Sequence, residues 1–189
     1  MLLFALQEEV VDINMPGYNV IVVVTGTGKA NAAMMTMKAV LSYRPSLIIN
    51  VGTAGTFNHH VGDIIVSNHF VDRDLMCLQL PGVVFDKISD AGTIVRRLPS
   101  IVDGMEVTDV HFVISTGDDF VTSLEKRRGD VVDMESFAEA SVCGEEGVPF
   151  FAVKYITDIV GRNSINHWGN KLADARRSLE TYFTSYMEL

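Results

Sequence analysis

The sequence predicts a single α/β domain, residues 1–189, with a central mixed, largely parallel twisted sheet flanked by helices. Three observations support this fold class. The chain is 189 residues long and 48% hydrophobic, which is enough for one substantial core. Residues 131–160 have the pattern of a strand, a helix and a second strand. Two more apolar segments, residues 18–24 and 46–51, each end in a glycine-rich turn, as buried strands often do.

The strand–helix–strand unit carries polar residues at its ends. Its last strand, residues 149–156, is mostly apolar, which is typical of a strand buried on both faces of a parallel sheet. Thr157 and Asp158 follow directly, so a carboxylate lies at the C-terminal end of that strand. The preceding helix is expected over residues 133–147, with acidic residues at its start and a glycine at its end. Open α/β sheets bind ligands at this edge, outside the carboxyl ends of the strands.

The rest of the chain alternates apolar and amphipathic segments. We expect a central strand at residues 18–24 and a C-terminal packing helix at residues 168–187, where apolar side chains recur at helical spacing. The other expected strands are residues 2–6, 46–51, 62–67 and 111–115, and the other expected helices are residues 30–42 and 88–98.

Two glycine turns follow predicted strands. In residues 25–29 (TGTGK) the glycines allow a tight turn, and the helix after it offers free amide groups at its N-terminus. A phosphate or another polar ligand could bind there. The spacing matches neither the Rossmann nor the Walker fingerprint, however, and a structural tight turn explains the glycines equally well. Residues 52–56 (GTAGT) are predicted to form the second turn.

Composition and charge limit the possible partners. The formal net charge of −9 and the pI near 4.9 argue against nucleic-acid or membrane-surface binding, because such partners are polyanionic. Cys77 and Cys143 lie far apart without the spacing of a disulfide framework or a zinc site, so we expect two buried thiols in a reducing compartment. The N-terminus lacks the basic region of a signal peptide, and no segment approaches the about 20 apolar residues of a membrane span. We therefore expect a cytoplasmic protein.

Three carboxylates fall at the ends of predicted elements: Glu9 after the first strand, Glu135 at a helix start and Asp158 at a strand end. Carboxylates without His or Cys clusters suit general acid–base chemistry better than transition-metal binding, so we expect no metal site. Each acid has a structural alternative, a helix cap or a surface salt bridge, and spacing alone does not choose between them.

In their order along the chain, several motifs resemble those of a known family. They are similar to the signatures of the nucleoside phosphorylase superfamily and, within it, of the 5′-methylthioadenosine/S-adenosylhomocysteine nucleosidases. The resemblance extends from the EEV turn at residues 8–10 to the C-terminal helix. The matching motifs are Gly52-Thr53-Ala54-Gly55, Gly62-Asp63-Ile64-Ile65-Val66, Ser115-Thr116-Gly117-Asp118-Asp119-Phe120, Val132-Asp133-Met134-Glu135 and Ile156-Thr157-Asp158. This resemblance implies a nucleoside phosphorylase-like fold and the cleavage of a purine nucleoside.

The resemblance also implies roles for individual residues. Glu9 would hold the attacking water, Glu135 would bind the ribose hydroxyls, and Asp158 would protonate the purine at N7. Thr157 takes the place of a hydroxyl residue that orients the aspartate. Thr53 takes the place of a hydroxyl residue near the water.

Three further residues would contact the substrate by the same resemblance. Phe120 would stack on the base, the backbone of Val121 would read the edge of the base, and Met134 would pack on the sugar. Packing in the core is the structural alternative for Phe120 and for Met134. Cleavage of an N-glycosidic bond builds positive charge on the sugar and negative charge on the departing base. Carboxylates and a proton donor therefore assist it, and neither a metal nor a cofactor is required.

The chain departs from the family pattern in three places. Residues 10–20 and 72–85 are shorter than the family norm, which predicts a sheet trimmed at one edge. Lys154 stands where relatives have an arginine, so a point charge replaces a bidentate fork. The family resemblance implies a homodimer. Because the second shortened segment lies near the subunit interface of relatives, we do not carry over the geometry of that dimer.

Three functions stay open from the sequence, all with a small-molecule nucleoside as partner. They are a nucleosidase that cleaves an adenine nucleoside with water, a phosphate-dependent nucleoside phosphorylase, and an inactive nucleoside-binding relative. Phosphorylases carry an arginine before the GTAG-like turn, where this chain has residues 49–51 (INV). That difference and the presence of Glu9 favour hydrolysis. Retention of Glu9, Glu135 and Asp158 together argues against a protein that only binds.

Overall fold

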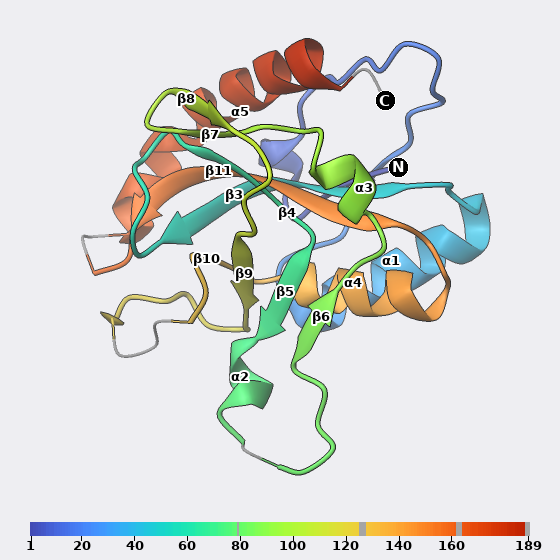
Figure 1. Cartoon of the computed structure of the whole chain (residues 1–189), viewed down its shortest axis with the longest axis horizontal. Coiled ribbons are helices and arrows are strands. Elements are labelled where there is room, and N and C mark those ends of the chain that lie inside the picture. The colour runs from blue at the N-terminus through green and yellow to red at the C-terminus, as the bar shows by residue number, and fades with distance from the viewer. Residues whose placement is uncertain (79, 125–127, 162–163, 188–189) are drawn as a thin grey trace.

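The computed structural model describes residues 1–78, 80–124, 128–161 and 164–187. These residues form one mixed sheet of 11 strands with helices packed on both faces, so the predicted α/β class is confirmed (Figure 1). The strands are β1 (Leu2–Phe4), β2 (Val22–Val24), β3 (Ile48–Thr56), β4 (Ile64–Ser67), β5 (His69–Asp72), β6 (Asp86–Ile88), β7 (Ser100–Val102), β8 (Met105–Val107), β9 (Val113–Thr116), β10 (Val131–Asp133) and β11 (Phe150–Ile159). The helices are η1 (Gln7–Glu9), α1 (Lys29–Tyr43), α2 (Arg73–Met76), α3 (Gly92–Val95), α4 (Ser136–Glu145) and α5 (Ser164–Tyr186).

Two long strands, β3 and β11, form the centre of the sheet. They pair in parallel over nearly their whole length, and β11 is buried on both faces, as its apolar sequence predicts. The strand order is β6-β5-β9-β10-β3-β11-β4-β7-β8, and β1 joins β2 to β3 beside this path. β4 runs antiparallel to β11, and β10 runs antiparallel to the end of β3.

The pairing of β3 with β11 changes register between Ile156 and Asp158. Neighbouring residues of a regular strand point to opposite faces of the sheet. An irregularity of this kind redirects side chains, and such irregularities are frequent beside functional sites. Here it lets two consecutive residues, Thr157 and Asp158, line the same cavity.

The sheet separates two apolar layers, with α5 on one face and α1 and α4 on the other (Figure 1). The layer beneath α5 includes Phe151, Val153, Tyr155, Leu179 and Tyr182. The layer beneath α1 and α4 includes Val40, Phe137, Phe150, Ala152 and Ile156. Alternate residues of β11 thus enter opposite layers, which explains why the strand needs apolar side chains on both faces.

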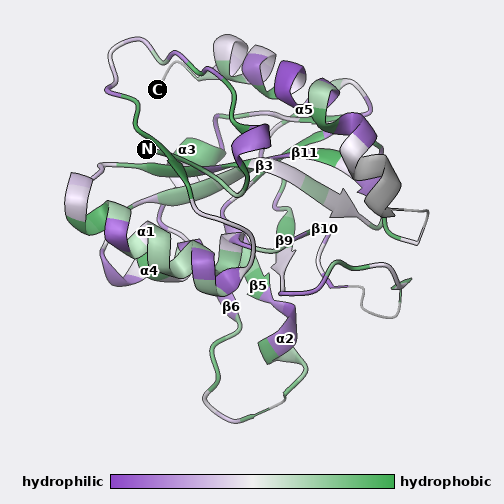
Figure 2. Cartoon of the chain, turned by 180° about the vertical axis from the view of Figure 1, so that it is seen from behind, coloured by the Kyte–Doolittle hydropathy of each residue, from purple (hydrophilic) through white to green (hydrophobic). Residues whose placement is uncertain are grey.

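The C-terminal helix α5 has the amphipathic pattern predicted for it. It begins at Ser164, four residues before the predicted start, and mixes hydrophilic and hydrophobic residues along its length (Figure 2). Its apolar face is buried through Ala175, Leu179, Tyr182 and Phe183. Within the described part of the chain, no helix is both long and apolar enough to cross a membrane.

Two predicted elements are wrong. The strand predicted as central at residues 18–24 is reduced to β2, which pairs with β1 at an edge of the described sheet and leaves Val22 43% exposed. β-Branched residues favour a strand, but they do not determine how many neighbours it has. The helix predicted at residues 88–98 is reduced to the four residues of α3. Ile88 ends β6, and Gly92 and Pro99, which are poor helix residues, lie at the start of α3 and directly after the predicted segment.

The glycine turn predicted at residues 52–56 is also wrong, because β3 runs through this segment as far as Thr56. Gly52 and Gly55 keep φ outside the left-handed region, so neither glycine is needed for a turn. Gly55 instead leaves space for the carboxylate of Asp158, because a Cβ at this position would lie 3.0 Å from Asp158 Oδ2.

Of the two cysteines that the sequence predicts to be buried, Cys143 is buried but Cys77 is exposed, so the prediction is wrong for Cys77.

Candidate active site

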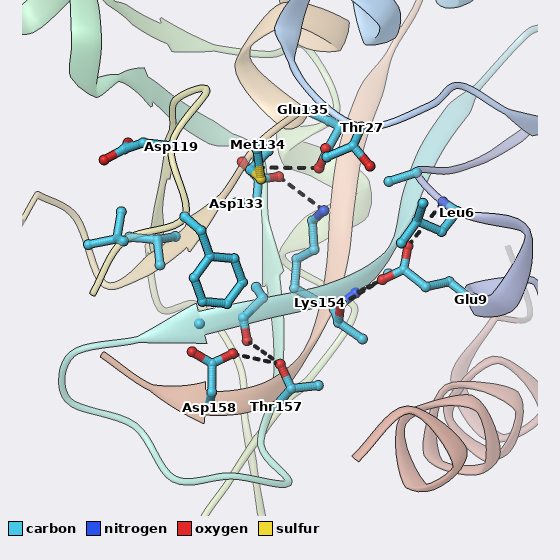
Figure 3. A pocket seen from close by; sticks show the side chains of 18 of the residues that line it. Leu6, Glu9, Thr27, Asp119, Asp133, Met134, Glu135, Lys154, Thr157 and Asp158 are labelled. Carbon is cyan, nitrogen blue, oxygen red and sulfur yellow. Dashed lines mark hydrogen bonds and ion pairs between the residues drawn. The ribbon is translucent and has the colours of Figure 1, made fainter. Parts of the chain in front are cut away.

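A cavity of about 350 Å³ opens where β3, β10 and β11 lie close to η1 (Figure 3). Its size suits a small ligand. The cavity lies near the edge of the sheet at which the sequence predicted a ligand site. All eight predicted site residues line it: Glu9, Thr53, Phe120, Val121, Met134, Glu135, Thr157 and Asp158.

Glu9 is a buried carboxylate held by three donors. Its Oε1 accepts the backbone N–H of Thr53 at 3.0 Å and the hydroxyl of Thr53 at 2.6 Å. Its Oε2 accepts the N–H of Leu6 at 3.3 Å, which ties it to the start of η1. A Cβ at Gly52 would lie 3.4 Å from Oε1, which is an ordinary contact, so the carboxylate packs closely against β3 without requiring a glycine there. These contacts leave Glu9 fixed at the cavity wall, where it can polarise a small hydroxylic molecule.

Glu135 lies at the N-terminal end of α4, but its side chain does not cap that helix. Its Oε1 accepts the N–H of Gly28 at 3.0 Å, and its Oε2 accepts the N–H of Met134 at 3.3 Å. Burial, and then the charge of Asp133, raise the pKa of Glu135 to about 7, against the opposing charge of Lys154. The helix-cap alternative is therefore excluded, and the carboxylate is available to accept hydrogen bonds from a ligand.

The glycine turn at residues 25–29 is tied to this site. The two amides at the start of α1 are occupied by carboxylates of the same chain: Gly28 donates to Glu135, and Lys29 donates to Asp118 Oδ1 at 2.7 Å. Gly28 has a φ of +90°, and a Cβ there would lie 3.1 Å from Asp118. The turn therefore positions Glu135, and these two amides are not free for a phosphate.

Asp158 and Thr157 form the opposite wall. Both are buried, and the Thr157 hydroxyl lies 2.9 Å from Asp158 Oδ1 and 3.3 Å from the carbonyl oxygen of Ala54. A Cβ at Gly55 would lie 3.0 Å from Asp158 Oδ2 and 3.1 Å from a methyl group of Val132. Gly55 therefore makes the room in which Asp158 lies.

Phe120, Val121 and Met134 contribute to the apolar part of the cavity. Phe120 is 41% exposed at the cavity, so it is not a core aromatic. Val121 is buried and packs with Val132 and Val160, which fixes the backbone next to Phe120. Met134 is half-buried, with its sulfur near the middle of the site (Figure 3).

Lys154 and Asp133 form a buried ion pair that the sequence did not predict. Their Nζ and Oδ2 atoms are 3.0 Å apart, and both side chains line the cavity. Asp133 also accepts the hydroxyl of Thr116 at 2.6 Å and both the N–H, at 3.1 Å, and the hydroxyl of Ser136. Burial acts to raise the pKa of Asp133, but Lys154 and the two hydroxyls outweigh it and lower the pKa below its usual value. The pair therefore holds the start of α4, where Glu135 lies.

Residues 7–186 of the chain match the family model described as "Phosphorylase superfamily". The chain belongs to this superfamily. Among curated relatives, the 5′-methylthioadenosine/S-adenosylhomocysteine nucleosidase of Bacillus subtilis (strain 168) is 34% identical over 167 residues, covering 78% of this chain and 71% of the relative. The protein of the same name from Bacillus cytotoxicus is 31% identical over 165 residues, with the same coverage. The predicted family is thus confirmed.

Solved structures agree with the superfamily fold. Native futalosine hydrolase of Helicobacter pylori strain 26695 matches with a TM-score of 0.79 at 19% identity, covering 99% of this chain and 96% of that chain. A putative 5′-methylthioadenosine/S-adenosylhomocysteine nucleosidase from Borrelia burgdorferi B31, bound to adenine, matches with a TM-score of 0.75 at 24% identity, covering 96% of this chain and 97% of that chain. At such identities these likenesses show the fold.

Arg73 also lines the cavity. The sequence did not predict it as a site residue, because the segment around it has no clear pattern of secondary structure. Arg73 is buried, and its Nε and its two terminal nitrogens all donate within the chain. The acceptors are the carbonyl oxygens of Ser115, Gly117, Asp119 and Asp133 and the carboxylate of Asp119. A guanidinium has five N–H donors. Here it fastens α2 to the ends of β9 and β10.

Glu139 is an acidic residue near the cavity that the sequence did not predict as part of the site. Its side chain is fully buried beneath the cavity, where its carboxylate accepts from the Asn50 amide at 2.6 Å and lies 3.5 Å from the Thr25 hydroxyl. Burial raises the pKa of Glu139 to about 8. A sequence signal existed, because Glu139 lies four residues after Glu135 on a helix that is otherwise largely buried.

Three residues with the spacing of metal ligands, His60, Asp63 and Asp103, lie outside the lining of this cavity. Asp63 accepts the backbone N–H of His60 at 2.9 Å and that of Asp103 at 3.0 Å. It therefore joins the turn before β4 to the turn between β7 and β8, a structural role.

Proposed function

We propose that the chain hydrolyses the N-glycosidic bond of an adenine nucleoside of the 5′-methylthioadenosine/S-adenosylhomocysteine type, releasing adenine and a ribose derivative. The observation that carries this proposal is that Glu9, Glu135 and Asp158 line one small cavity from three different elements. The names of the curated relatives support the same substrate class.

In this proposal the base lies between Phe120 and Asp158. The Phe120 ring stacks on the purine, and the backbone of Val121 reads its edge. Asp158, oriented by the Thr157 hydroxyl, donates a proton to N7 as the bond breaks. The base then leaves as a neutral molecule, which lowers the barrier for a poor leaving group.

The sugar lies between Glu135 and Glu9. Ionised Glu135 accepts hydrogen bonds from the ribose hydroxyls, and Met134 packs against the ring. Glu9, held by Thr53 and Leu6, orients the water that attacks the anomeric carbon. Both carboxylates also favour the positive charge that develops on the sugar, so they stabilise the transition state more than the ground state.

Arg73 and Lys154, the two cationic side chains among the described residues that line the cavity, already interact with acceptors of the protein, which favours hydrolysis over phosphorolysis. A phosphorylase must neutralise a phosphate, for which arginine is best suited. Among the described residues, Arg73 donates to carbonyl oxygens and to Asp119, and Lys154 pairs with Asp133. A protein that only binds nucleosides would gain little from keeping three acids in a buried site, where each costs desolvation.

We also propose, from the family resemblance, that the chain forms a homodimer, and from its composition that it is cytoplasmic. A molar mass of about twice 20.8 kDa in light scattering would support the dimer.

The function is tested with a panel of adenine nucleosides, by following the release of free base with and without phosphate. We expect release in both conditions, fastest for a 5′-thio-substituted adenosine, with the free sugar as the second product. Activity that appears only when phosphate is supplied would replace the hydrolase with a phosphorylase. Tight binding of the nucleoside without release of base in either condition would show that the protein is an inactive nucleoside-binding relative.

A further inference from the structure

Four ionisable groups lie together at the wall of the cavity and beneath it: Asp133, Glu135 and Lys154, which line the cavity, and Glu139. All four are buried, and Lys154 is only 2% exposed. Glu135 and Glu139 lie one helical turn apart on one face of α4. If every group were charged, three carboxylates would face one ammonium, and two negative charges would have no counterion. Because such charges are costly in a buried site, the cluster keeps a proton at neutral pH.

The hydrogen bonds determine which acid holds that proton. Asp133 has four donors, among them the Lys154 ammonium at 3.0 Å. Glu135 accepts from two backbone amides. Glu139 has one close donor, the Asn50 amide, and within the described residues it has no cation within 4.0 Å. The carboxylate with the weakest set of donors is the one that remains neutral.

The elements packed around Glu139 add no further compensating charge. β10 contributes Asp133 and β11 contributes Lys154, while β3 contributes the neutral Asn50. The buried residues of α1, which packs against α4, carry no charge: Ala32, Thr36, Ala39 and Val40. Along α4, Cys143 follows one turn later, and burial raises the pKa of its thiol so that it stays neutral. Lys87 of β6 reaches α4 only near Gly144. β9 carries no ionisable residue, and the two ionisable residues of β5 have partners elsewhere: Asp72 pairs with Lys29, and His69 contacts Asp86.

We propose that Glu139 is a positioning residue for the reaction proposed above: it holds the proton of this cluster and, by staying neutral, leaves Lys154 paired with Asp133. That pair anchors Ser136 and the start of α4, and so fixes Glu135 at the cavity wall. Once Glu139 ionises, the ammonium faces a third carboxylate and is drawn away from Asp133. Glu135 then loses its place, and turnover falls.

The substitution Glu139→Gln tests this inference, because glutamine keeps the size and the contact with Asn50 but never ionises. For the wild type we expect kcat/KM for 5′-methylthioadenosine to fall above about pH 8, by up to tenfold per pH unit. This alkaline fall should be absent in Glu139→Gln when each profile is normalised to its own maximum. Glu145→Gln, on the exposed end of the same helix, is the matched control and should keep the wild-type profile. An unchanged alkaline fall in Glu139→Gln, or no fall in the wild type, would overturn the inference.

Thermal unfolding gives a readout that does not need the proposed activity. With a pKa raised from 4.5 to about 8, Glu139 binds a proton in the folded chain that the unfolded chain has released within this window. Wild-type stability from this group therefore falls as pH rises through the window. The Tm of Glu139→Gln minus that of the wild type should grow from about pH 5 to 8 and then level off. A constant difference would overturn the inference even if the enzyme is active.

The inference stays testable if the wild type is inactive or if the variant does not fold. If the wild type releases no base at any pH, the proposed function is wrong, and the Tm difference alone decides whether Glu139 holds the proton. If Glu139→Gln does not fold, Glu139→Met takes its place, because it is also uncharged at every pH and predicts the same two results.

Discussion

Thr53 holds one oxygen of Glu9 with two hydrogen bonds, one from its backbone N–H at 3.0 Å and one from its hydroxyl at 2.6 Å. Both donors come from β3, which continues as a strand past Gly52 instead of turning there. Because strand backbone is rigid, the position of the carboxylate is set by the sheet itself. Glu9 is thereby prepared before any ligand arrives.

Removal of the Thr53 hydroxyl should therefore reduce activity. Thr53→Val keeps the shape of the side chain and the backbone donor. A hydrogen bond to a charged group contributes about 1.5–3 kcal/mol, so we expect kcat/KM for adenine release to fall about 10- to 100-fold. Thr53→Ser restores the hydroxyl and should recover most of the activity. Equal activity of the Val and Ser variants would show that the hydroxyl does not position Glu9.

Glu135→Gln should keep the fold and lose turnover. The carboxylate is proposed to accept two charge-assisted hydrogen bonds from the sugar and to face the developing positive charge. Loss of about 2–4 kcal/mol of transition-state stabilisation corresponds to about 1.5 to 3 decades in kcat/KM. Circular dichroism and Tm serve as controls for folding. Wild-type kcat/KM in this variant would mean that Glu135 only holds the α1 turn through Gly28.

The pH dependence of kcat/KM in the wild type should reflect the ionisation of Glu135. The pKa of Glu135 is raised to about 7, so its ionised form is lost as pH falls through neutrality. We therefore expect kcat/KM to decline below about pH 7, and the residual activity of Glu135→Gln to lack this decline. A flat wild-type profile between about pH 5.5 and 7.5 would contradict the need for an ionised Glu135.

The elements best predicted from the sequence were those with a strong and repeated pattern. Residues 149–156 were correctly placed in a buried strand, because a run that is apolar on both faces fits only a covered sheet. The edge location of β2 and the short α3 were not predicted, since pairing partners and helix length depend on tertiary contacts. The eight residues proposed for the site, which line one cavity, were singled out through ordered motifs whose spacing survives the shortened connections.

What the sequence could not provide was the charge balance of the site. Lys154 was noticed as a departure from relatives, but its partner Asp133 lies on another strand. Arg73 and Glu139 face inward only because of the way β5, β9 and α4 pack. The register change after Ile156, which brings Thr157 and Asp158 to one cavity, is likewise a property of the paired strands and not of either sequence alone.

Gly55→Ala should impair the acid at the far wall. The new Cβ would lie 3.0 Å from Asp158 Oδ2, closer than side chains normally approach, and Val132 blocks its other side at 3.1 Å. Asp158 must then shift by a few tenths of an ångström, and we expect a loss of about 10-fold in kcat. Gly52→Ala is the matched comparison, because its Cβ would meet Glu9 at 3.4 Å, an ordinary contact. A loss in Gly52→Ala as large as that in Gly55→Ala would contradict this steric explanation.

The proton-donor role of Asp158 is tested with two leaving groups. Asp158→Asn keeps the size of the side chain and can still hydrogen-bond with Thr157, but it cannot deliver a proton. An unprotonated purine is a poor leaving group, and loss of general acid catalysis typically costs about 10²–10⁴-fold. The nitrophenolate of a nitrophenyl riboside leaves readily as an anion, without protonation. The penalty for Asp158→Asn should therefore be much smaller with this substrate than with an adenine nucleoside.

The comparison uses kcat/KM for both substrates in the wild type and in Asp158→Asn, so that each substrate is its own reference. If Asp158 acts only by positioning the ligand or by maintaining the wall beside Gly55, its removal affects both substrates, and the two penalties are equal. If Asp158 donates the proton, the penalty follows the basicity of the leaving group. Equal losses on the two substrates would therefore remove Asp158 as the general acid and leave proton delivery to another group or to water.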